Sequence, residues 1–298
     1  MGESQGYPGF VETGLRSPIT EFALSLVAHR ANEFHPSGTA AVIAPHLAIT
    51  AKHVITDYWE RYEGCVPEEG LMSGTFYLQA FQCLREGTVG ALWDVTRLWL
   101  SPHTDVAFLR LTPASDQAVH HVWRAPRMNL LPPPVQSRVS GFGYHSSSIV
   151  PVAEDGKTVS LRWKDAPTTT RGTVVEHHVV RRDSVCLTFP CYRMDARFDG
   201  GMSGGPIFNA DGELAGVICS SMPPDELDGE HTSYAATLWP AMGTVIDMDR
   251  DDSPRGRSYP VLELAERGYL RARHWERIEL CGREGDLVRQ IGLRQSLK

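Results

Sequence analysis

The chain has 298 residues, 42% of them hydrophobic and 22% charged, and carries a net charge of −7 at pH 7. This length is enough to bury a substantial core, as one large domain or two modest ones. The acidic balance, without a basic stripe, argues against nucleic acid as the main partner. No apolar run approaches the roughly eighteen residues of a membrane-spanning helix, so we expect no membrane partner.

The first half of the chain has the pattern of an antiparallel β-sheet protein. Residues 1–18 are rich in Gly, Pro and polar side chains, and we expect them to form a flexible arm. Short alternating apolar segments then follow one another between loops. Within residues 19–115 we expect strands at Thr20–His29, Gly38–Ile49 with a turn at Pro45-His46, Thr75–Leu84, Thr88–Leu100 and Asp105–Leu111.

A second half repeats this pattern after a proline-rich stretch. Residues 116–134 show little periodicity and are interpreted as a crossover linker. Many short strands between loops favour an all-β core, closed or sandwiched. Within residues 135–246 we expect strands at Ser137–Gly143, Thr158–Trp163, Gly172–Val180, Ser184–Phe189 and Tyr234–Trp239.

Residues 247–298 differ in character and form a C-terminal extension. A charged linker at 249–256 precedes apolar residues at helical spacing from Val261 to Ala272, with Pro260 suited to a first helical turn. Trp275–Leu280 has the pattern of a strand. Two interpretations stay open: a helical extension that packs on the second half, or an appendage that docks a regulatory partner.

One glycine-rich stretch, Gly201-Met202-Ser203-Gly204-Gly205-Pro206, points to chemistry. Glycines around a serine leave space for a substrate carbonyl and allow steep turns. The N–H groups of Gly201 and Ser203 are then candidates for an oxyanion hole. A hairpin follows at Ile207–Ile218, so the serine precedes a strand, unlike the strand-to-helix elbow of an α/β-hydrolase.

A serine nucleophile needs a base and a group that orients the base. His53 follows the apolar run 40–49 in Thr50-Ala51-Lys52-His53-Val54, and Asp105 begins a strand-like segment. The order His, Asp, Ser, with spacings of 105 − 53 = 52 and 203 − 105 = 98 residues, resembles the trypsin/chymotrypsin-like serine protease family, in its bacterial, intracellular type.

The resemblance covers roughly residues 20–246 and implies both fold and activity. It implies an all-β fold of two six-stranded antiparallel β-barrels, with the active site in the cleft between them. It further implies a serine endopeptidase that hydrolyses protein or peptide substrates through an acyl-enzyme. In that scheme Ser203 attacks, His53 transfers the proton and Asp105 holds the imidazole. A latent or inactive protease-fold binding protein is the alternative, and an esterase is a weaker one.

Two residues depart from the family pattern near the nucleophile. Met202 stands where zymogen-activated members carry an aspartate, so activation by an ion pair with a new N-terminus is not expected. The oxyanion hole is then preformed, or set by loops, a partner or a ligand. Cys219 stands where a serine is usual, and a thiol is a weaker donor to the triad carboxylate.

Substrate preference is less determined than mechanism. By position, Arg197 falls at the base of the specificity pocket, and Cys219, Ser220 and Ser221 lie on the strand that lines the substrate cleft. Arg197 either favours an acidic or polar substrate residue or turns away to pair with Asp195 or Asp199. Both alternatives stay open.

The remaining cysteines and histidines carry no predicted chemistry. The six cysteines are Cys65, Cys83, Cys186, Cys191, Cys219 and Cys281, and Val54 replaces the cysteine that secreted family members carry after the histidine. No secretory signal begins the sequence, so we expect reduced thiols and a cytoplasmic protein, with a processed secreted form as the alternative. His177-His178 near Cys186 and Cys191 match no common zinc spacing, so we expect no metal and no cofactor.

Overall fold

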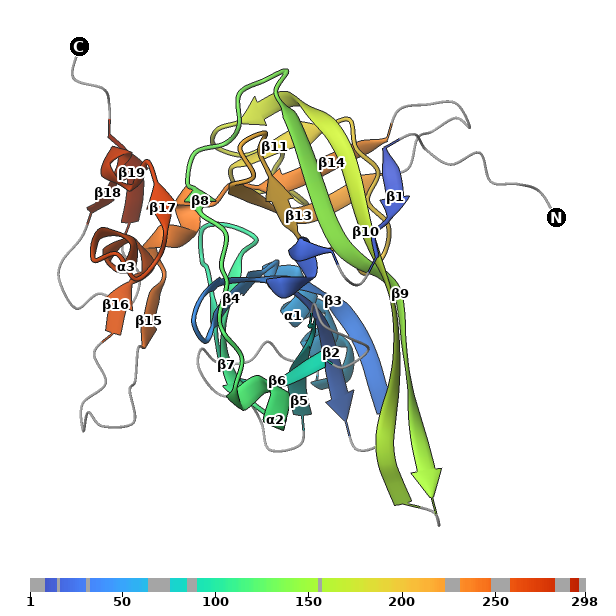
Figure 1. Ribbon diagram of the computed structural model, residues 1–298. Coiled ribbons are helices and arrows are strands. Elements are labelled where there is room, and N and C mark those ends of the chain that lie inside the picture. The colour runs from blue at the N-terminus through green and yellow to red at the C-terminus, as the bar shows by residue number, and fades with distance from the viewer. Residues whose placement is uncertain are drawn as a thin grey trace.

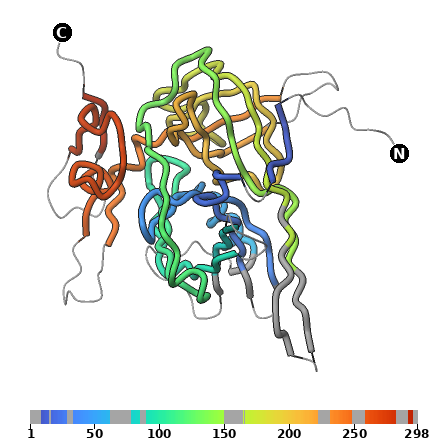
Figure 2. The backbone as a smooth tube through the Cα atoms, viewed as in Figure 1, coloured from blue at the N-terminus to red at the C-terminus, as the bar shows by residue number. Residues whose placement is uncertain are grey.

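The computed structural model shows two β-barrels, one above the other, with the C-terminal segment beside them (Figures 1 and 2). Within the described residues, no helix is long and apolar enough to cross a membrane. The described residues are 9–14, 17–30, 33–63, 76–84, 90–154, 157–222, 231–247, 258–281 and 290–294.

The first barrel contains six antiparallel strands. They close in the order β2-β3-β4-β7-β6-β5. Their inward side chains, such as Leu24, Ala48 and Leu109, are fully buried, because alternation along each strand turns every second residue to the barrel axis. The strands are β2 (Ala23–Arg30), β3 (Glu33–Ala44), β4 (Leu47–Thr50), β5 (Phe76–Cys83), β6 (Gly90–Leu100) and β7 (Ala107–Pro113).

The second barrel is built in the same way. Its strands follow the order β12-β9-β10-β11-β14-β13, and the antiparallel pairing of β12 with β13 closes the ring. The expected fold of two six-stranded antiparallel barrels is therefore confirmed. The strands are β9 (Arg138–Glu154), β10 (Lys157–His178), β11 (Cys191–Met194), β12 (Pro206–Phe208), β13 (Leu214–Met222) and β14 (Thr232–Ala236).

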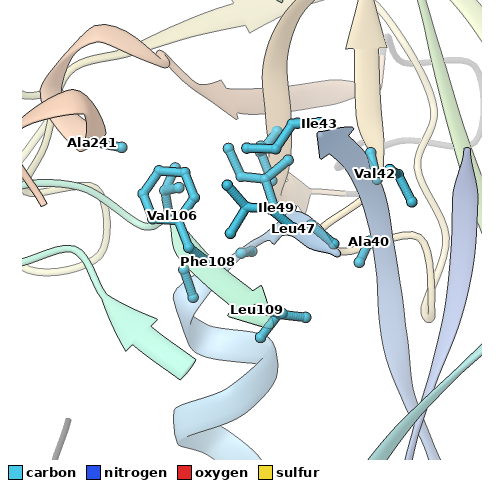
Figure 3. Close-up of a cluster of buried hydrophobic side chains, with 14 of the residues drawn as sticks. Ala40, Val42, Ile43, Leu47, Ile49, Val106, Phe108, Leu109 and Ala241 are labelled. Carbon is cyan, nitrogen blue, oxygen red and sulfur yellow. The ribbon is translucent and has the colours of Figure 1, made fainter. Parts of the chain in front are cut away.

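The apolar interior continues from the first barrel into the second half of the chain. Figure 3 shows side chains of β3, β4 and β7 that pack together, with Ala241 of η2 (Trp239–Gly243) at the edge of the cluster. The large side chains at its centre have no solvent exposure. The labelled members are Ala40, Val42, Ile43, Leu47, Ile49, Val106, Phe108, Leu109 and Ala241.

Three parts of the chain differ from the local expectations. The helix α1 (Lys52–Glu63) follows β4 and was not predicted, although its residues Ile55 and Trp59 stand at helical spacing and are both buried. Residues 184–189 form bends instead of a strand. In the N-terminal arm, β1 (Phe10–Glu12) pairs with β10, so this part of the arm is not flexible as expected. The arm leads into η1 (Pro18–Glu21), a 3-10 turn. Residues 1–8 lie outside the described residues.

The crossover linker contains α2 (Asp116–Val119) and β8 (Met128–Asn129). Strand β8 pairs in parallel with β13 of the second barrel and with β17 (Ala272–Arg273) of the C-terminal extension. The linker thus joins the extension to the barrel sheet.

The C-terminal extension is mostly strand and loop, so the expectation of a helical extension is wrong for most of its described length. The one α-helix among its described residues, α3 (Val261–Glu266), is short because Gly268 follows with a left-handed φ of 76°. The charged linker 249–256 lies outside the described residues. The other elements are β16 (Ser258–Pro260), β17, η3 (Trp275–Arg277), β18 (Ile278–Cys281) and β19 (Gln290–Leu293). Strand β16 pairs with β15 (Val245–Asp247), which lies at the boundary with the second barrel.

The extension is packed into the molecule. Leu262 and Leu264 of α3, with Leu270, are buried in the same core cluster as the first barrel. Arg273 of β17 lies 3.2 Å from the buried carboxylate of Glu213, which precedes β13. These contacts favour the structural interpretation of the extension over a separate appendage.

Candidate active site

His53 and Asp105 meet because β4 and β7 are neighbours. Thr50, the last residue of β4, pairs with Ala107, the first of β7. The chain enters α1 directly after β4, which places His53 in the first helical turn beside Asp105. His53 Nδ1 lies 2.6 Å from Asp105 Oδ2, and the His53 backbone N–H donates to Asp105 Oδ1 at 2.8 Å.

The hydrogen bond between Nδ1 and the Asp105 carboxylate determines the tautomer of the imidazole. A carboxylate accepts only, so Nδ1 carries a proton and Nε2 is left as the basic nitrogen. Burial by itself would lower the pKa of His53, but the hydrogen bond to Asp105 and the negative charges of Asp105 and Asp57 raise it above its ordinary value. Asp105 is itself buried, with a side chain 9% exposed.

The loop that carries Ser203 is fixed to the first barrel. Gly204 has a φ of 82°, and a Cβ there would collide with Thr50 Oγ1 and the Thr39 carbonyl. Thr50 lies three residues before His53, so the serine loop and the histidine helix meet at one corner. Only glycine allows both this φ and this approach.

Thr39 of β3 makes the closest polar contacts between the serine loop and the first barrel. Its backbone N–H donates to the Ser203 carbonyl at 2.8 Å. Its hydroxyl donates to the Gly201 carbonyl at 2.9 Å and accepts the Tyr144 N–H at 2.9 Å. Sequence reasoning missed Thr39, because a threonine in an apolar strand gives no local sign of such partners.

The two N–H groups expected to form an oxyanion hole donate no hydrogen bond to any described residue. The neighbouring Met202 and Gly204 N–H groups donate to the carbonyls of Asp199 and Ile218. Neither Gly201 nor Ser203 donates its N–H to another described residue. Gly201 has a φ of 90°, which turns the peptide at this point.

A family model described as the trypsin-like peptidase domain matches residues 38–217, which include His53, Asp105 and Ser203. The chain belongs to this family. A trypsin-like peptidase domain implies a serine hydrolase that acts on proteins or peptides.

Solved structures similar to this trypsin-like peptidase include the active form of the Rv3671c protease from M. tuberculosis. That structure is 16% identical, with a TM-score of 0.45 over 75% of this chain and 78% of that chain. Its inactive form is 17% identical, with a TM-score of 0.45 over 75% of this chain and 86% of that chain. No curated protein matches the sequence.

Met202 is a core residue of this trypsin-like peptidase. Its side chain has no solvent exposure, and its sulfur accepts the Asp199 N–H at 3.5 Å. A Cβ at Gly143 would lie 2.6 Å from Met202 Cα, so the small residue on β9 makes room for it. Apolar packing therefore occupies the position that an aspartate fills in zymogen-activated members.

Cys219 lies near the Asp105 charge but does not bind the carboxylate. Its thiol donates to the Tyr234 carbonyl at 3.2 Å. Burial, followed by the Asp105 charge, raises the pKa of Cys219 well above its ordinary value, so the thiol stays neutral. The Cys219 thiol, a weak donor, therefore forms its hydrogen bond within the second barrel, to the Tyr234 carbonyl.

Arg197 pairs with Asp199. The guanidinium makes two hydrogen bonds of 2.8 and 2.7 Å to the Asp199 carboxylate and lies 4.6 Å above the Phe10 ring of β1. Asp195 instead accepts the Thr173 N–H. The Arg197 charge is thus compensated within the protein.

The other predicted substrate-binding residues lie on β13. Ser220 pairs with Tyr234 across β13 and β14, and the Ser221 hydroxyl lies 3.0 Å from that of Ser233. Their contact with substrate stays a prediction.

The described part of the chain holds five free thiols and no group of three or more metal-ligating side chains. Cys65 lies outside the described residues. His177 contacts the Pro133 carbonyl at 2.7 Å, a structural partner in the crossover linker. The Cys191 thiol is buried, and this burial raises its pKa to about 12.

Proposed function

We propose that this trypsin-like peptidase is a serine endopeptidase with Ser203 as nucleophile, His53 as base and Asp105 as orienting carboxylate. The observation that carries the proposal is the pair of hydrogen bonds, 2.8 and 2.6 Å, by which Asp105 holds both the backbone and the ring of His53. The attachment of the Ser203 loop to Thr39 and Thr50, next to the histidine helix, supports it.

The reaction follows from the roles of these groups. Ser203 Oγ attacks the scissile carbonyl while His53 Nε2 accepts its proton, and Asp105 stabilises the resulting imidazolium. The oxyanion receives hydrogen bonds from the N–H groups of Gly201 and Ser203. His53 then protonates the leaving amine, and a water molecule, deprotonated by His53, hydrolyses the acyl-enzyme.

A fluorophosphonate probe tests the nucleophile directly. We expect a single adduct at Ser203, located by mass spectrometry, and its loss in Ser203→Ala and His53→Ala. Ser184→Ala is the matched control, because Ser184 is an exposed serine of the same half of the chain and has no predicted role in the site. A folded wild-type chain without an adduct would contradict the proposal and support an inactive binding protein.

A substrate comparison separates a peptidase from an esterase. We expect the wild-type enzyme, not treated with the probe, to cleave peptide bonds in a denatured-protein library, with products identified by mass spectrometry. Hydrolysis of esters with no peptide cleavage would contradict the endopeptidase assignment while leaving the triad intact.

A further inference from the structure

Lys52 directly precedes His53 and begins helix α1. Its ammonium group donates a hydrogen bond of 2.8 Å to the carbonyl of Ser101. Ser101 is fully buried and begins the short turn between β6 and β7 that carries Asp105. The side chain therefore reaches from the histidine helix to the base of the aspartate turn.

The turn is closed at the same point. The Ser101 N–H donates to the Val106 carbonyl at 2.9 Å, so the residues on either side of the turn are held together. Asp105 binds His53 at one end of the turn, and Lys52 binds Ser101 at the other. Two consecutive helix residues thus hold the turn at two points, which limits how far Asp105 can move relative to His53.

Lys52 also affects the charge balance of the pair. Burial lowers the pKa of Lys52, and the negative charge of Asp105 partly offsets that effect. A buried carboxylate is costly unless hydrogen bonds and a nearby cation stabilise it. Among the described residues, the other titratable groups that act on the pair are Asp57 of α1, through His53, and the neutral Cys219 thiol of β13.

We propose that Lys52 is a positioning residue of the triad, which holds the Asp105 turn against α1 and places a cation near the carboxylate. This inference rests on the proposed roles of His53 and Asp105. It assigns a function to a lysine that sequence reasoning passed over, although a charged residue between a buried strand and His53 is a local signal.

The sign of the effect follows from electrostatics. Without the Lys52 cation, the Asp105 charge is less compensated and stabilises the imidazolium more, so the pKa of His53 rises. His53 is then protonated up to a higher pH, so the acidic limb of the pH–rate profile of labelling moves to higher pH. Loss of the Ser101 hydrogen bond also loosens the turn, and we expect labelling to slow by about tenfold.

The test compares four variants by the pH dependence of fluorophosphonate labelling. Lys52→Met removes charge and hydrogen bond, Lys52→Gln keeps a donor without charge, and Lys52→Arg keeps both. Lys164→Met is the matched control, because Lys164 is an exposed lysine on β10. We expect an upward shift of the limb in the Met and Gln variants, near wild-type behaviour in Lys52→Arg, and no change in the control.

A second readout does not depend on activity. In a Ser203→Ala background, an NMR titration of the His53 ring reports its pKa in the Lys52 variants. An unlabelled wild-type chain would contradict the proposed function, while the titration still measures the effect of Lys52 on His53. A His53 pKa that is the same in Lys52→Met and Lys52→Arg would overturn the inference, even if labelling slows in both.

Discussion

Replacement of Thr39 by valine tests how the serine loop is held. The hydroxyl of Thr39 bridges the Gly201 carbonyl and the Tyr144 N–H, each at 2.9 Å, and Thr39 is fully buried. Valine has nearly the same shape, so Thr39→Val removes the hydroxyl without opening a cavity. The backbone bond from Thr39 to Ser203 stays available.

The expected cost follows from the two partners left behind. A buried donor or acceptor without a partner costs about 1–3 kcal/mol. Two such groups, in part relieved by local movement, predict a loss of about 2–4 kcal/mol in the free energy of unfolding. Because Gly201 supplies a proposed oxyanion donor, we also expect labelling of Ser203 to slow by about 10–100-fold.

Urea unfolding and the rate of fluorophosphonate labelling measure the two effects. Thr39→Ser is the control at the same site, since it keeps the hydroxyl and loses only a methyl group, worth about 1 kcal/mol. Thr96→Val is the remote control, because its bond to Thr112 is exposed. If the valine variant matches the serine variant in both stability and labelling, the hydroxyl bridge does not position the loop.

Three further predictions concern the triad, the serine loop and the extension. Asp105→Asn should slow labelling by about 10⁴-fold. It should also lower the pKa of His53, which NMR can measure. In the wild type, the raised pKa of His53 stabilises the folded state below pH 6.5, and this stabilisation is lost as the pH rises through the His53 pKa of the folded protein. Gly204→Ala should lower the free energy of unfolding by more than about 2 kcal/mol in urea titrations, because of its φ and its clash with Thr50, and an unchanged midpoint would refute this. Removal of residues 249–298 deletes Leu262 and Leu264 and exposes the apolar side chains of the first-barrel cluster that they pack against, so calorimetry should show loss of the cooperative transition or aggregation; a folded, active remainder would identify the extension as a separate appendage.

Local pattern was sufficient for much of the fold. Alternating apolar residues predicted strands, and the motifs around His53, Asp105 and Ser203 led through family resemblance to two barrels. Prediction failed where long-range pairing determines structure. Residues 10–12 become a strand only because the edge of β10 accepts them, and Ala272–Arg273 because β8 lies alongside.

The sequence by itself determined which residue types are present: a serine among glycines, a histidine after a buried strand, and a carboxylate before another. Only the tertiary structure decided their partners. It brought Asp105 within 2.6 Å of His53, paired Arg197 with Asp199 instead of Asp195, and extended Lys52 to Ser101. Some of these contacts join residues far apart in the chain, and the Arg197 contact selects one of two nearby carboxylates. Barrel closure and side-chain rotamers determine them, and neither leaves a periodic trace in the sequence.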